Sequence, residues 1–262
     1  MSTATQDRVG GVAIDLVGDG LPVTVFAHGL GGSSAETRSL ATRLSGTRVL
    51  LTFRGHGRSD AVDGGWSYDA LADDLLAVAD AVDADRVCAL SVGSGALLRA
   101  LTRDPDRFVR IACVLPAALD GDRADAATER VRAVGDAIDQ GDIDGVTALL
   151  MLDVPEDWRG RRGVGALLRR RAAALCERPA PRPAVVERPL TSRALLSEVT
   201  APALVVAQEG DPLHSTEVAV DLAAALPVSD LLVLPPGGVF WSASRQAQDA
   251  LADHLTPAEK SA

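Results

Sequence analysis

Short apolar runs rich in valine and leucine alternate along the chain with longer segments whose apolar residues recur at helical spacing. Most of the short runs are apolar on both faces, which is typical of parallel strands covered by helices. The runs that we expect to form strands are 11–17, 23–28, 48–53, 86–90, 109–115, 203–208 and 231–235. The segments that we expect to form helices between them include 35–44, 70–82 and 217–226. This alternation predicts an α/β fold, with a mostly parallel central sheet flanked by helices.

Residues 119–195 interrupt the pattern, because they read as helical and contain no convincing strand. They end in the proline-rich stretch RPAPRPAVVERP at 178–189. Proline fixes φ and cannot continue a helix, so this stretch predicts an extended return to the core. We therefore expect a core formed by 1–118 and 196–262, with 119–195 inserted as a helical cap. The cap is expected over the carboxyl ends of the strands, where open α/β sheets bind ligands.

Composition and charge narrow the class of protein. The chain has 262 residues, of which 47% are hydrophobic and 24% charged, so it can bury a sizeable core. Its net charge of −10 disfavours nucleic acid and anionic membranes as partners. No apolar segment is long enough to span a bilayer, and the first residues lack the pattern of a signal peptide. These features predict a soluble cytoplasmic protein whose partner is a small-molecule substrate.

The cysteines and short motifs point to no metal or cofactor. Cys88, Cys113 and Cys176 show no paired spacing, which fits a reducing compartment. Cys88 and Cys113 lie in apolar runs and are expected in the core. The chain shows no spacing of metal ligands, no Walker loop and no dinucleotide fingerprint. We therefore expect no metal and no cofactor.

Four motifs occur in an order that resembles the α/β-hydrolase superfamily. They are VFAHGLGGS at 25–33, FRGHGRSD at 53–60, CALSVGSGALLRAL at 88–101 and VVAQEGDPLH at 205–214. The resemblance covers about 9–118 and 196–256, and it implies an α/β-hydrolase fold. It also implies a serine nucleophile on a sharp turn from strand to helix, with backbone amides that form an oxyanion hole.

Two serines compete for the nucleophile position. If SVGSG (91–95) is the turn, Gly93 occupies that position; if ALSVG (89–93) is the turn, Ser91 does. The second register requires only that Ala89 replace a glycine, and it leaves small residues to open the helix. We therefore favour Ser91 over Ser94 as the residue presented to the pocket.

The resemblance also assigns the oxyanion hole. The amide of Val92 directly follows Ser91 at a helix N-terminus, where unpaired N–H groups stabilise negative charge. The amide of Leu30, in His28-Gly29-Leu30, is implied as the second donor. Gly29 lets the backbone turn under the substrate, and His28 is expected to have a structural role.

The sequence provides the acid of a catalytic triad at its expected position but not the base. Asp211 follows a buried strand at the position that the resemblance gives to the acid, where it would orient a histidine. The superfamily places the histidine after the last strand, but LPPGGVFW has Val239 there. Valine cannot accept a proton, so Ser91 lacks its usual general base.

Few histidines are available to replace it. Besides His28, the chain has His56, His214 and His254. His56, in RGHGRS, resembles a common structural residue of the superfamily near the site. His254 is expected on the outer face of the final helix. His214 lies three residues after Asp211. It either pairs with Asp211 and reaches toward Ser91, or begins a helix near solvent.

The predicted cap carries residues that could bind substrate. Its arginines are Arg159, Arg161, Arg162, Arg169, Arg170 and Arg171. They either form a solvated helix face or clamp a carboxylate or phosphate, which would make the substrate anionic.

The three tryptophans are Trp158 in the predicted cap and Trp66 and Trp241 in the predicted core. They either line the pocket or pack within the protein.

These features predict a serine-dependent enzyme that acts on a small ester, thioester, lactone or amide, with a displaced or missing histidine base. One alternative is a lyase, cyclase or isomerase of the same fold that uses the oxyanion hole as an electrophile. Another is an inactive protein that retains the pocket for binding. The sequence leaves the oligomeric state open.

Overall fold

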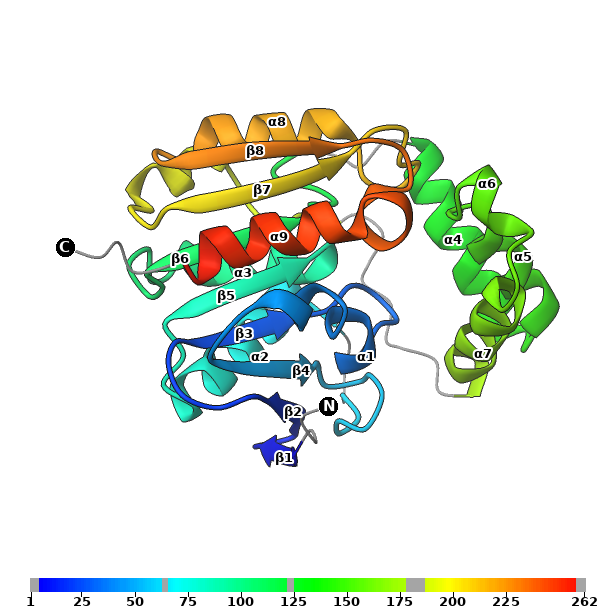
Figure 1. Ribbon diagram of the computed structural model, residues 1–262, viewed down its shortest axis with the longest axis horizontal. Helices are drawn as coiled ribbons and strands as arrows, with labels where there is room; N and C mark the ends of the chain where they lie inside the picture. Colours follow the sequence, from blue (N-terminus) through cyan, green and yellow to red (C-terminus); the bar gives the residue numbers. More distant parts are fainter. Residues whose placement is uncertain (1–4, 63–65, 122–124, 178–186, 258–262) are drawn as a thin grey trace.

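The computed structural model describes residues 5–62, 66–121, 125–177 and 187–257. Within them, the strands form one eight-stranded sheet in the order β1-β2-β4-β3-β5-β6-β7-β8 (Figure 1). Strand β2 is antiparallel to both of its neighbours, and every pair from β4 to β8 is parallel. The predicted α/β fold with a mostly parallel sheet is therefore confirmed. The strands are β1 (Thr5–Val9), β2 (Val12–Val17), β3 (Val23–Ala27), β4 (Thr47–Thr52), β5 (Arg86–Leu90), β6 (Arg110–Val114), β7 (Ala203–Gln208) and β8 (Ser229–Leu234).

Helices cover both faces of the sheet. They include α1 (Ser34–Thr37), the 3₁₀ turn η1 (Leu40–Arg43), α2 (Tyr68–Ala81), α3 (Val92–Leu101), the 3₁₀ helix η2 (Arg193–Glu198), α8 (Thr216–Ala225), the π-helical turn η3 (Gly238–Ser242) and α9 (Ser244–Leu255). Residues of α2, α3 and α8 pack on one face, and those of η1 and α9 on the other. Strand β5 is apolar after Arg86 because its side chains alternate between the two faces: Val87 and Ala89 belong to the first cluster, and Cys88 and Leu90 belong to the second.

Two parts of the sheet region differ from the sequence predictions. Strand β1 was not expected, because TQDRV is polar; it pairs with β2 at the sheet edge, where most of its side chains are exposed. Residues 35–44 form α1 and η1 instead of one helix. Hydrogen bonds from Ser34 and Arg38 to Asp15 hold the first turn against β2, so tertiary contacts override the local helical pattern.

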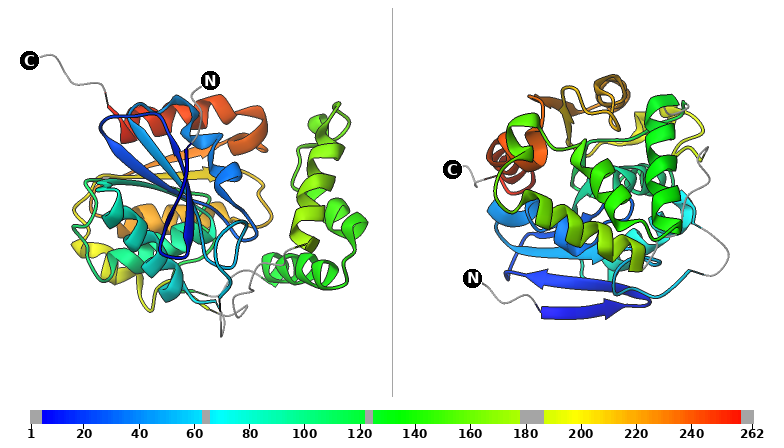
Figure 2. Two further views of the ribbon diagram at one scale, coloured as in Figure 1. Left: turned by 90° about the horizontal axis from the view of Figure 1, so that it is seen from below. Right: turned by 90° about the vertical axis from the view of Figure 1, so that its right-hand side faces the viewer.

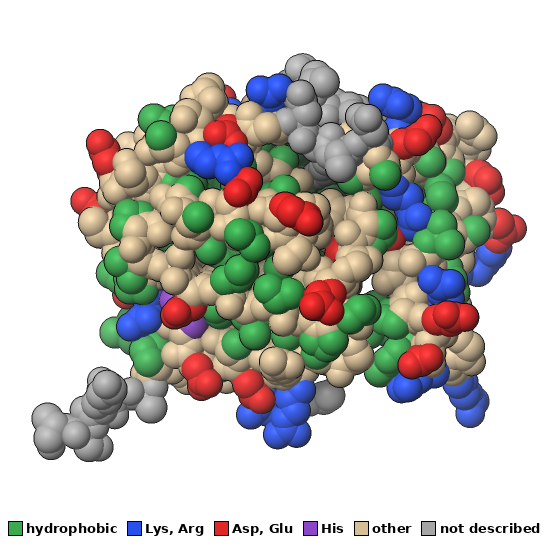
Figure 3. Space-filling model, turned by 90° about the horizontal axis from the view of Figure 1, so that it is seen from above, with side chains coloured by type: hydrophobic (Ala, Val, Ile, Leu, Met, Phe, Trp, Pro, Cys, Tyr) green, Lys and Arg blue, Asp and Glu red, His purple; other side chains and the backbone are tan. Residues whose placement is uncertain are grey.

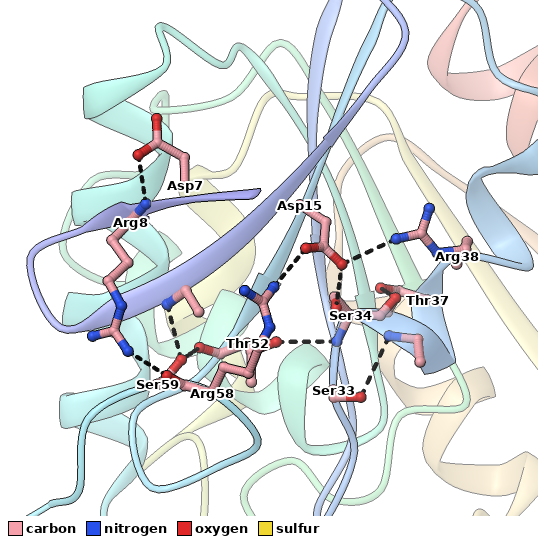
Figure 4. Close-up of polar contacts among 12 residues, drawn as sticks. Asp7, Arg8, Asp15, Ser33, Ser34, Thr37, Arg38, Thr52, Arg58 and Ser59 are labelled. Carbon is pink, nitrogen blue, oxygen red and sulfur yellow. Dashed lines mark hydrogen bonds and ion pairs between the residues drawn. The ribbon is translucent and has the colours of Figure 1, made fainter. Parts of the chain in front are cut away.

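Asp15 is the centre of this buried polar network (Figure 4). Asp15 is 5% exposed, and its carboxylate accepts hydrogen bonds from Ser34 Oγ at 2.7 Å, Arg38 Nη2 at 3.0 Å and Arg58 Nη2 at 2.6 Å. The network ties β2 to α1 and to the loop after β4. It thereby fixes the segment that follows the His28-Gly29-Leu30 turn.

Replacing Asp15 with alanine is expected to lower the free energy of unfolding by about 2 to 3 kcal/mol. The change leaves two guanidinium groups without their anion and a buried hydroxyl without an acceptor, although the arginines are partly exposed. Urea denaturation measures the loss. The matched control is Asp60→Ala, whose carboxylate pairs with Arg8 at the surface and is worth less than about 1 kcal/mol. Equal losses in the two variants would contradict the central role of Asp15.

Helices α4 to α7 lie beyond the carboxyl ends of the parallel strands (Figure 1). Figure 2 shows the same helices to one side of the sheet in its left view. Their bounds are α4 (Asp125–Asp139), α5 (Ile143–Met151), α6 (Glu156–Arg159) and α7 (Val164–Glu177). The amide of Leu190 donates to the carbonyl of Leu119 at 3.2 Å, and Arg193 pairs with Asp120 at 2.9 Å. The chain thus leaves and rejoins the sheet region at neighbouring points.

The limits of the cap, 119 and 195, remain a prediction. Part of the proline-rich stretch that we expect to be extended, 178–186, lies outside the described residues.

Cys88 and Cys113 are buried in β5 and β6, as predicted, and burial raises the pKa of both thiols.

Among the described helices, none is both long enough and apolar enough to cross a bilayer. On the face in Figure 3, acidic and basic side chains are interspersed with apolar ones.

Candidate active site

Ser91 lies at a sharp turn between a strand and a helix. Strand β5 ends at Leu90 and α3 begins at Val92, so Ser91 alone connects them. Its backbone has φ 54° and ψ −113°, a conformation that residues with a side chain rarely adopt. Its amide donates to the carbonyl of Val114 at 2.8 Å, which helps to hold this strained geometry. Ser91 itself is half-buried.

Two glycines allow this turn to pack closely. A Cβ added to Gly93 would lie 2.8 Å from the carbonyl oxygens of Ala27 and His28 at the end of β3. A Cβ added to Gly95 would collide with the ring of Tyr68. The small residues of SVGSG are therefore required by the approach of α3 to β3 and α2.

A histidine and a carboxylate complete a chain of hydrogen bonds from Ser91. The Oγ of Ser91 lies 2.8 Å from Nε2 of His214, and Nδ1 of His214 lies 3.1 Å from Oδ1 of Asp211. Both partners come from the loop between β7 and α8. A hydroxyl bonded to an imidazole, whose second nitrogen faces a carboxylate, can be activated for attack on a carbonyl carbon.

The loop itself orders Asp211. Its Oδ1 also accepts hydrogen bonds from the amides of Leu213 at 2.8 Å and His214 at 3.0 Å. The side chains of Asp211 and His214 are only 11% and 14% exposed. Burial by itself would raise the pKa of Asp211, but the hydrogen bonds and charge of His214, with the two amides, outweigh it and lower the pKa. Asp211 is therefore held as a carboxylate facing the imidazole.

The turn after β3 packs directly against Ser91. A Cβ added to Gly29 would lie 3.3 Å from the Cβ of Ser91. Among the described residues, neither the amide of Leu30 nor that of Val92 has a hydrogen-bond acceptor. In the described part of the chain, both amides are therefore free to bind another acceptor.

Ser94 and His28, which the sequence suggested as site residues, are buried and form hydrogen bonds with the backbone of the core. Ser94 is fully buried and donates to the carbonyl of Ala89 at 2.8 Å, so its hydroxyl points into the core. His28 is also fully buried; its Nε2 accepts from the amide of Phe53 at 3.0 Å, and its Nδ1 donates to the carbonyl of Gly29 at 2.7 Å. Burial, with the neighbouring His56, lowers the pKa of His28 to about 3. His28 is neutral, and both of its ring nitrogens are occupied.

His56 and His254 do not contact Ser91. The ring of His56 is buried against that of His28, with centroids 5.0 Å apart. The expectation that His254 lies on the outer face of α9 is wrong. Its side chain is partly buried, and its Nε2 bonds the carbonyl of Ile111 on β6 at 2.9 Å. The helix turns this side chain toward the sheet, because the backbone of β6 offers it a hydrogen bond.

Val239 occupies a buried position in η3. Its side chain is 1% exposed and belongs to the apolar cluster beneath α9, while its amide donates to Oε1 of Gln208 at 3.2 Å. Two residues earlier, Gly237 has φ 74°, and an added Cβ would collide with Pro155 of the α4–α7 segment. Beside this contact, a cavity of about 180 Å³ is lined by Pro155, Gln208, Asp211 and Gly237, among others.

Most of the arginines named in the sequence are already paired. Arg159 bonds the carbonyl of Val154, Arg161 stacks over the ring of Trp158 at 3.8 Å, Arg169 pairs with Asp144, and Arg171 pairs with Glu36. Arg162 and Arg170 are exposed. Three of these four paired arginines therefore interact with residues of the α4–α7 segment itself, and Arg171 interacts with Glu36 of α1.

The tryptophans pack rather than gather around Ser91. The rings of Trp158 and Trp241 lie 5.7 Å apart, so they join α6 to η3. Trp66 is 6% exposed and packs in the main core beside Tyr68. Among the described residues, no group of three His, Cys, Asp or Glu side chains could hold a metal ion.

Sequence reasoning missed Glu36. Its Oε2 accepts from the amide of Gly29 at 3.1 Å, although the two residues are seven positions apart. The only signal is an acidic residue in the first turn of a short helix directly after HGLGGS.

A comparison with protein families matches residues 24–254 to the alpha/beta hydrolase family, so the chain belongs to that family. No curated protein sequence matches the chain.

Solved structures with the same fold include two esterases and a hydrolase of meta-cleavage products. The esterase EaEST from Exiguobacterium antarcticum is 19% identical, with a TM-score of 0.71 over 97% of this chain and 99% of that one. The meta-cleavage product hydrolase CumD from Pseudomonas fluorescens IP01 is 18% identical, with a TM-score of 0.75 over 94% and 96%. A thermophilic esterase from Thermogutta terrifontis is 20% identical, with a TM-score of 0.68 over 95% and 97%. At these identities the likeness concerns the fold.

Proposed function

We propose that the protein is a serine hydrolase that cleaves small-molecule esters or related acyl compounds. Ser91 acts as the nucleophile, His214 as the general base and Asp211 as the acid that orients it. The observation that carries this proposal is the 2.8 Å contact between Ser91 Oγ and His214 Nε2, continued at 3.1 Å from His214 Nδ1 to Asp211. In this arrangement the histidine comes from the loop after β7, and Val239 has no catalytic role.

The reaction proceeds in two halves. The Ser91 hydroxyl attacks the carbonyl carbon and passes its proton to Nε2 of His214, which then protonates the departing alcohol, thiol or amine. In the second half, His214 takes a proton from water as the water oxygen attacks the acyl–Ser91 ester, and it then returns this proton to Ser91 Oγ as the bond to the acyl carbon breaks, which releases the acid and restores Ser91. Asp211 accepts the Nδ1 proton in a hydrogen bond, which keeps Nε2 free to act as a base and stabilises the imidazolium ion.

The amides of Val92 and Leu30 form the oxyanion hole. Val92 is the first residue of α3, so its amide lies at the positive end of the helix dipole. Val92 directly follows Ser91, Leu30 follows the Gly29 that packs against Ser91, and neither amide has another acceptor among the described residues. Fixed donors of this kind stabilise the charge on the carbonyl oxygen as the tetrahedral intermediate forms.

Helices α4 to α7 serve as a cap over this site. Their position beyond the carboxyl ends of the strands supports this role, as do their contacts with the Gly237 turn and with Glu36. Because most of the cap arginines are paired within the protein, an uncharged substrate is favoured over an anionic one. The names of the structural neighbours, esterases and a hydrolase of meta-cleavage products, agree with hydrolysis of a small carbonyl compound.

The contact of His214 with Ser91 supplies a base for a serine nucleophile, which supports hydrolysis over simple binding. A lyase, cyclase or isomerase that uses the oxyanion hole, with Asp211 or a histidine for proton transfer, is the second candidate, and fluorophosphonate labelling together with ester turnover separates the two.

Labelling with a fluorophosphonate tests the proposal. The probe is expected to add one phosphonyl group to the intact protein, and peptide mapping is expected to place it on Ser91. Phosphorus is attacked by an activated serine oxygen, and the adduct mimics the tetrahedral intermediate. Ser91→Ala is expected to abolish the mass increase, whereas Ser94→Ala retains it because the Ser94 hydroxyl faces the core. Absence of labelling in the folded wild-type protein, together with absence of ester turnover, would overturn the proposal.

A further inference from the structure

The carboxylate of Glu36 is shared between the turn beside Ser91 and the predicted cap. Its Oε2 accepts from the amide of Gly29 at 3.1 Å, and its Oε1 pairs with Nη2 of Arg171 on α7 at 2.7 Å. The Glu36 side chain is only 15% exposed, whereas Arg171 is 44% exposed. One side chain of α1 therefore contacts both the core turn and the overlying helix.

The core side of this contact is rigid. Ser34, two residues before Glu36, donates its hydroxyl to Asp15 and its amide to Oγ1 of Thr52 at 3.1 Å (Figure 4). Arg38, two residues after Glu36, also binds Asp15. The helix that carries Glu36 is thus anchored to β2 and β4 on both sides of that residue. Its Oε2 is a fixed acceptor for the Gly29 amide.

The turn from Gly29 to Gly32 is closed by its own hydrogen bond and packs tightly against Glu36. The amide of Gly32 donates to the carbonyl of Gly29 at 3.0 Å. A Cβ added to Gly32 would collide with Oε2 of Glu36. The peptide unit after Gly29 carries the Leu30 amide, so the hydrogen bonds on both sides of Gly29 set the direction of that donor.

Helix α7 meets the same turn at a second point. Leu175 lies one helical turn after Arg171, on the same side of α7. A Cβ added to Gly31 would lie 2.7 Å from Cδ2 of Leu175. The turn that holds Leu30 is therefore enclosed between α1 of the core and α7 of the α4–α7 segment.

We propose that Glu36 is a positioning residue that makes the oxyanion hole depend on the docked position of α7. Glu36 orients the Leu30 amide by holding the neighbouring Gly29 amide, and Arg171 supplies the compensating positive charge. Without Arg171, a bare carboxylate beside the oxyanion hole would oppose the negative charge that develops on the substrate oxygen. The proposal rests on the proposed hydrolase function for its effect on turnover, but its structural part can be measured separately.

A double-mutant cycle tests the coupling by ester turnover. Arg171→Met is expected to lower kcat about tenfold with KM little changed, because it leaves Glu36 uncompensated. Glu36→Gln retains an oxygen acceptor for the Gly29 amide and is expected to lower kcat no more than about threefold. The double variant is expected to be more active than Arg171→Met alone, since the uncompensated charge is gone. Losses that simply add would overturn the electrostatic part of the proposal.

Hydrogen exchange on the intact protein provides a readout that does not depend on activity. Peptides covering residues 27–32 are expected to exchange faster in Arg171→Met than in the wild type, and Arg171→Lys is expected to restore part of the protection. The matched control is Arg169→Met on the same helix, whose partner Asp144 belongs to α5. It is expected to leave turnover and exchange at 27–32 unchanged.

The outcomes separate the two proposals. Faster exchange at 27–32 in Arg171→Met, in a protein that fluorophosphonate does not label, would support the coupling and reject the hydrolase. Labelling of Ser91 with unchanged exchange in a folded Arg171→Met variant would support the hydrolase and reject the coupling. An equal rise in exchange in the Arg169→Met control would also reject it, since the effect would then be a general loosening of α7.

Discussion

Replacing His214 with alanine is expected to lower kcat for a p-nitrophenyl ester by about 10³- to 10⁵-fold, with a much smaller change in KM. All four histidines of the chain lie in described residues, and His214 is the one whose ring reaches Ser91. Without it, the Ser91 hydroxyl must lose its proton to water in the transition state. The residual activity would come from the oxyanion hole and substrate binding. Steady-state kinetics on the purified variant measure the loss, and the rate of fluorophosphonate labelling is expected to fall in parallel.

Two variants serve as controls for this result. His254→Gln removes an imidazole whose hydrogen bond is to Ile111, and it is expected to change kcat less than about twofold. Val239→Ala is expected to cost about 1 to 2 kcal/mol of stability, because it opens space in a buried apolar cluster, and to retain turnover at temperatures well below unfolding. Turnover in His214→Ala equal to that of the wild type would exclude His214 as the base.

Replacing Asp211 with asparagine is expected to lower kcat by about 10²- to 10⁴-fold. Asp211 Oδ1 accepts from the His214 ring and from two backbone amides, so an amide oxygen can preserve the loop while the negative charge is lost. The imidazolium ion that forms during attack would then have no counter-charge. Kinetics on the same ester measure the loss, and the exposed neighbour Glu209→Gln is the matched control for removal of an acid after β7. A similar kcat in both variants would contradict the role of Asp211.

Asp211→Asn is also expected to lower the free energy of unfolding by an amount that depends on pH. The pKa of Asp211 in the folded protein lies below its ordinary value of 3.8, so the ionised carboxylate stabilises the fold above that value. This contribution is lost as the pH falls through the lowered pKa. The difference in unfolding free energy between the wild type and Asp211→Asn is therefore expected to be largest above about pH 5 and to shrink on acidification below about pH 4. Urea denaturation at several pH values measures it.

Much of the fold could be predicted because its local patterns agree with its tertiary structure. The inner strands of the parallel sheet are buried on both faces, and the apolar runs mark these strands and the partly exposed edge strand β8 to within about two residues at each end. The hairpin strand β1 could not be found in this way. Its residues are polar and exposed, and only pairing with β2 defines it.

The sequence indicated most residues of the candidate site, but it did not show which of their side chains contact one another. The chain order of motifs placed Ser91, Leu30, Val92 and Asp211 at one edge of the sheet. It left open whether Ser91 or Ser94 faces outward, and local spacing cannot settle this because both serines lie at the start of α3. In the structure the Ser94 hydroxyl bonds the carbonyl of Ala89, which directs it inward.

The sequence by itself determined the fold class, a turn from strand to helix within residues 89–95 and the valine at position 239, since each depends on residues that are near one another in the chain. Only the tertiary structure decided that His214 meets Ser91 across 123 positions and that Arg171 meets Glu36 across 135. The physical reason is that a side-chain hydrogen bond forms within about 3 Å, whereas the direction of a side chain in a loop depends on every element packed around it.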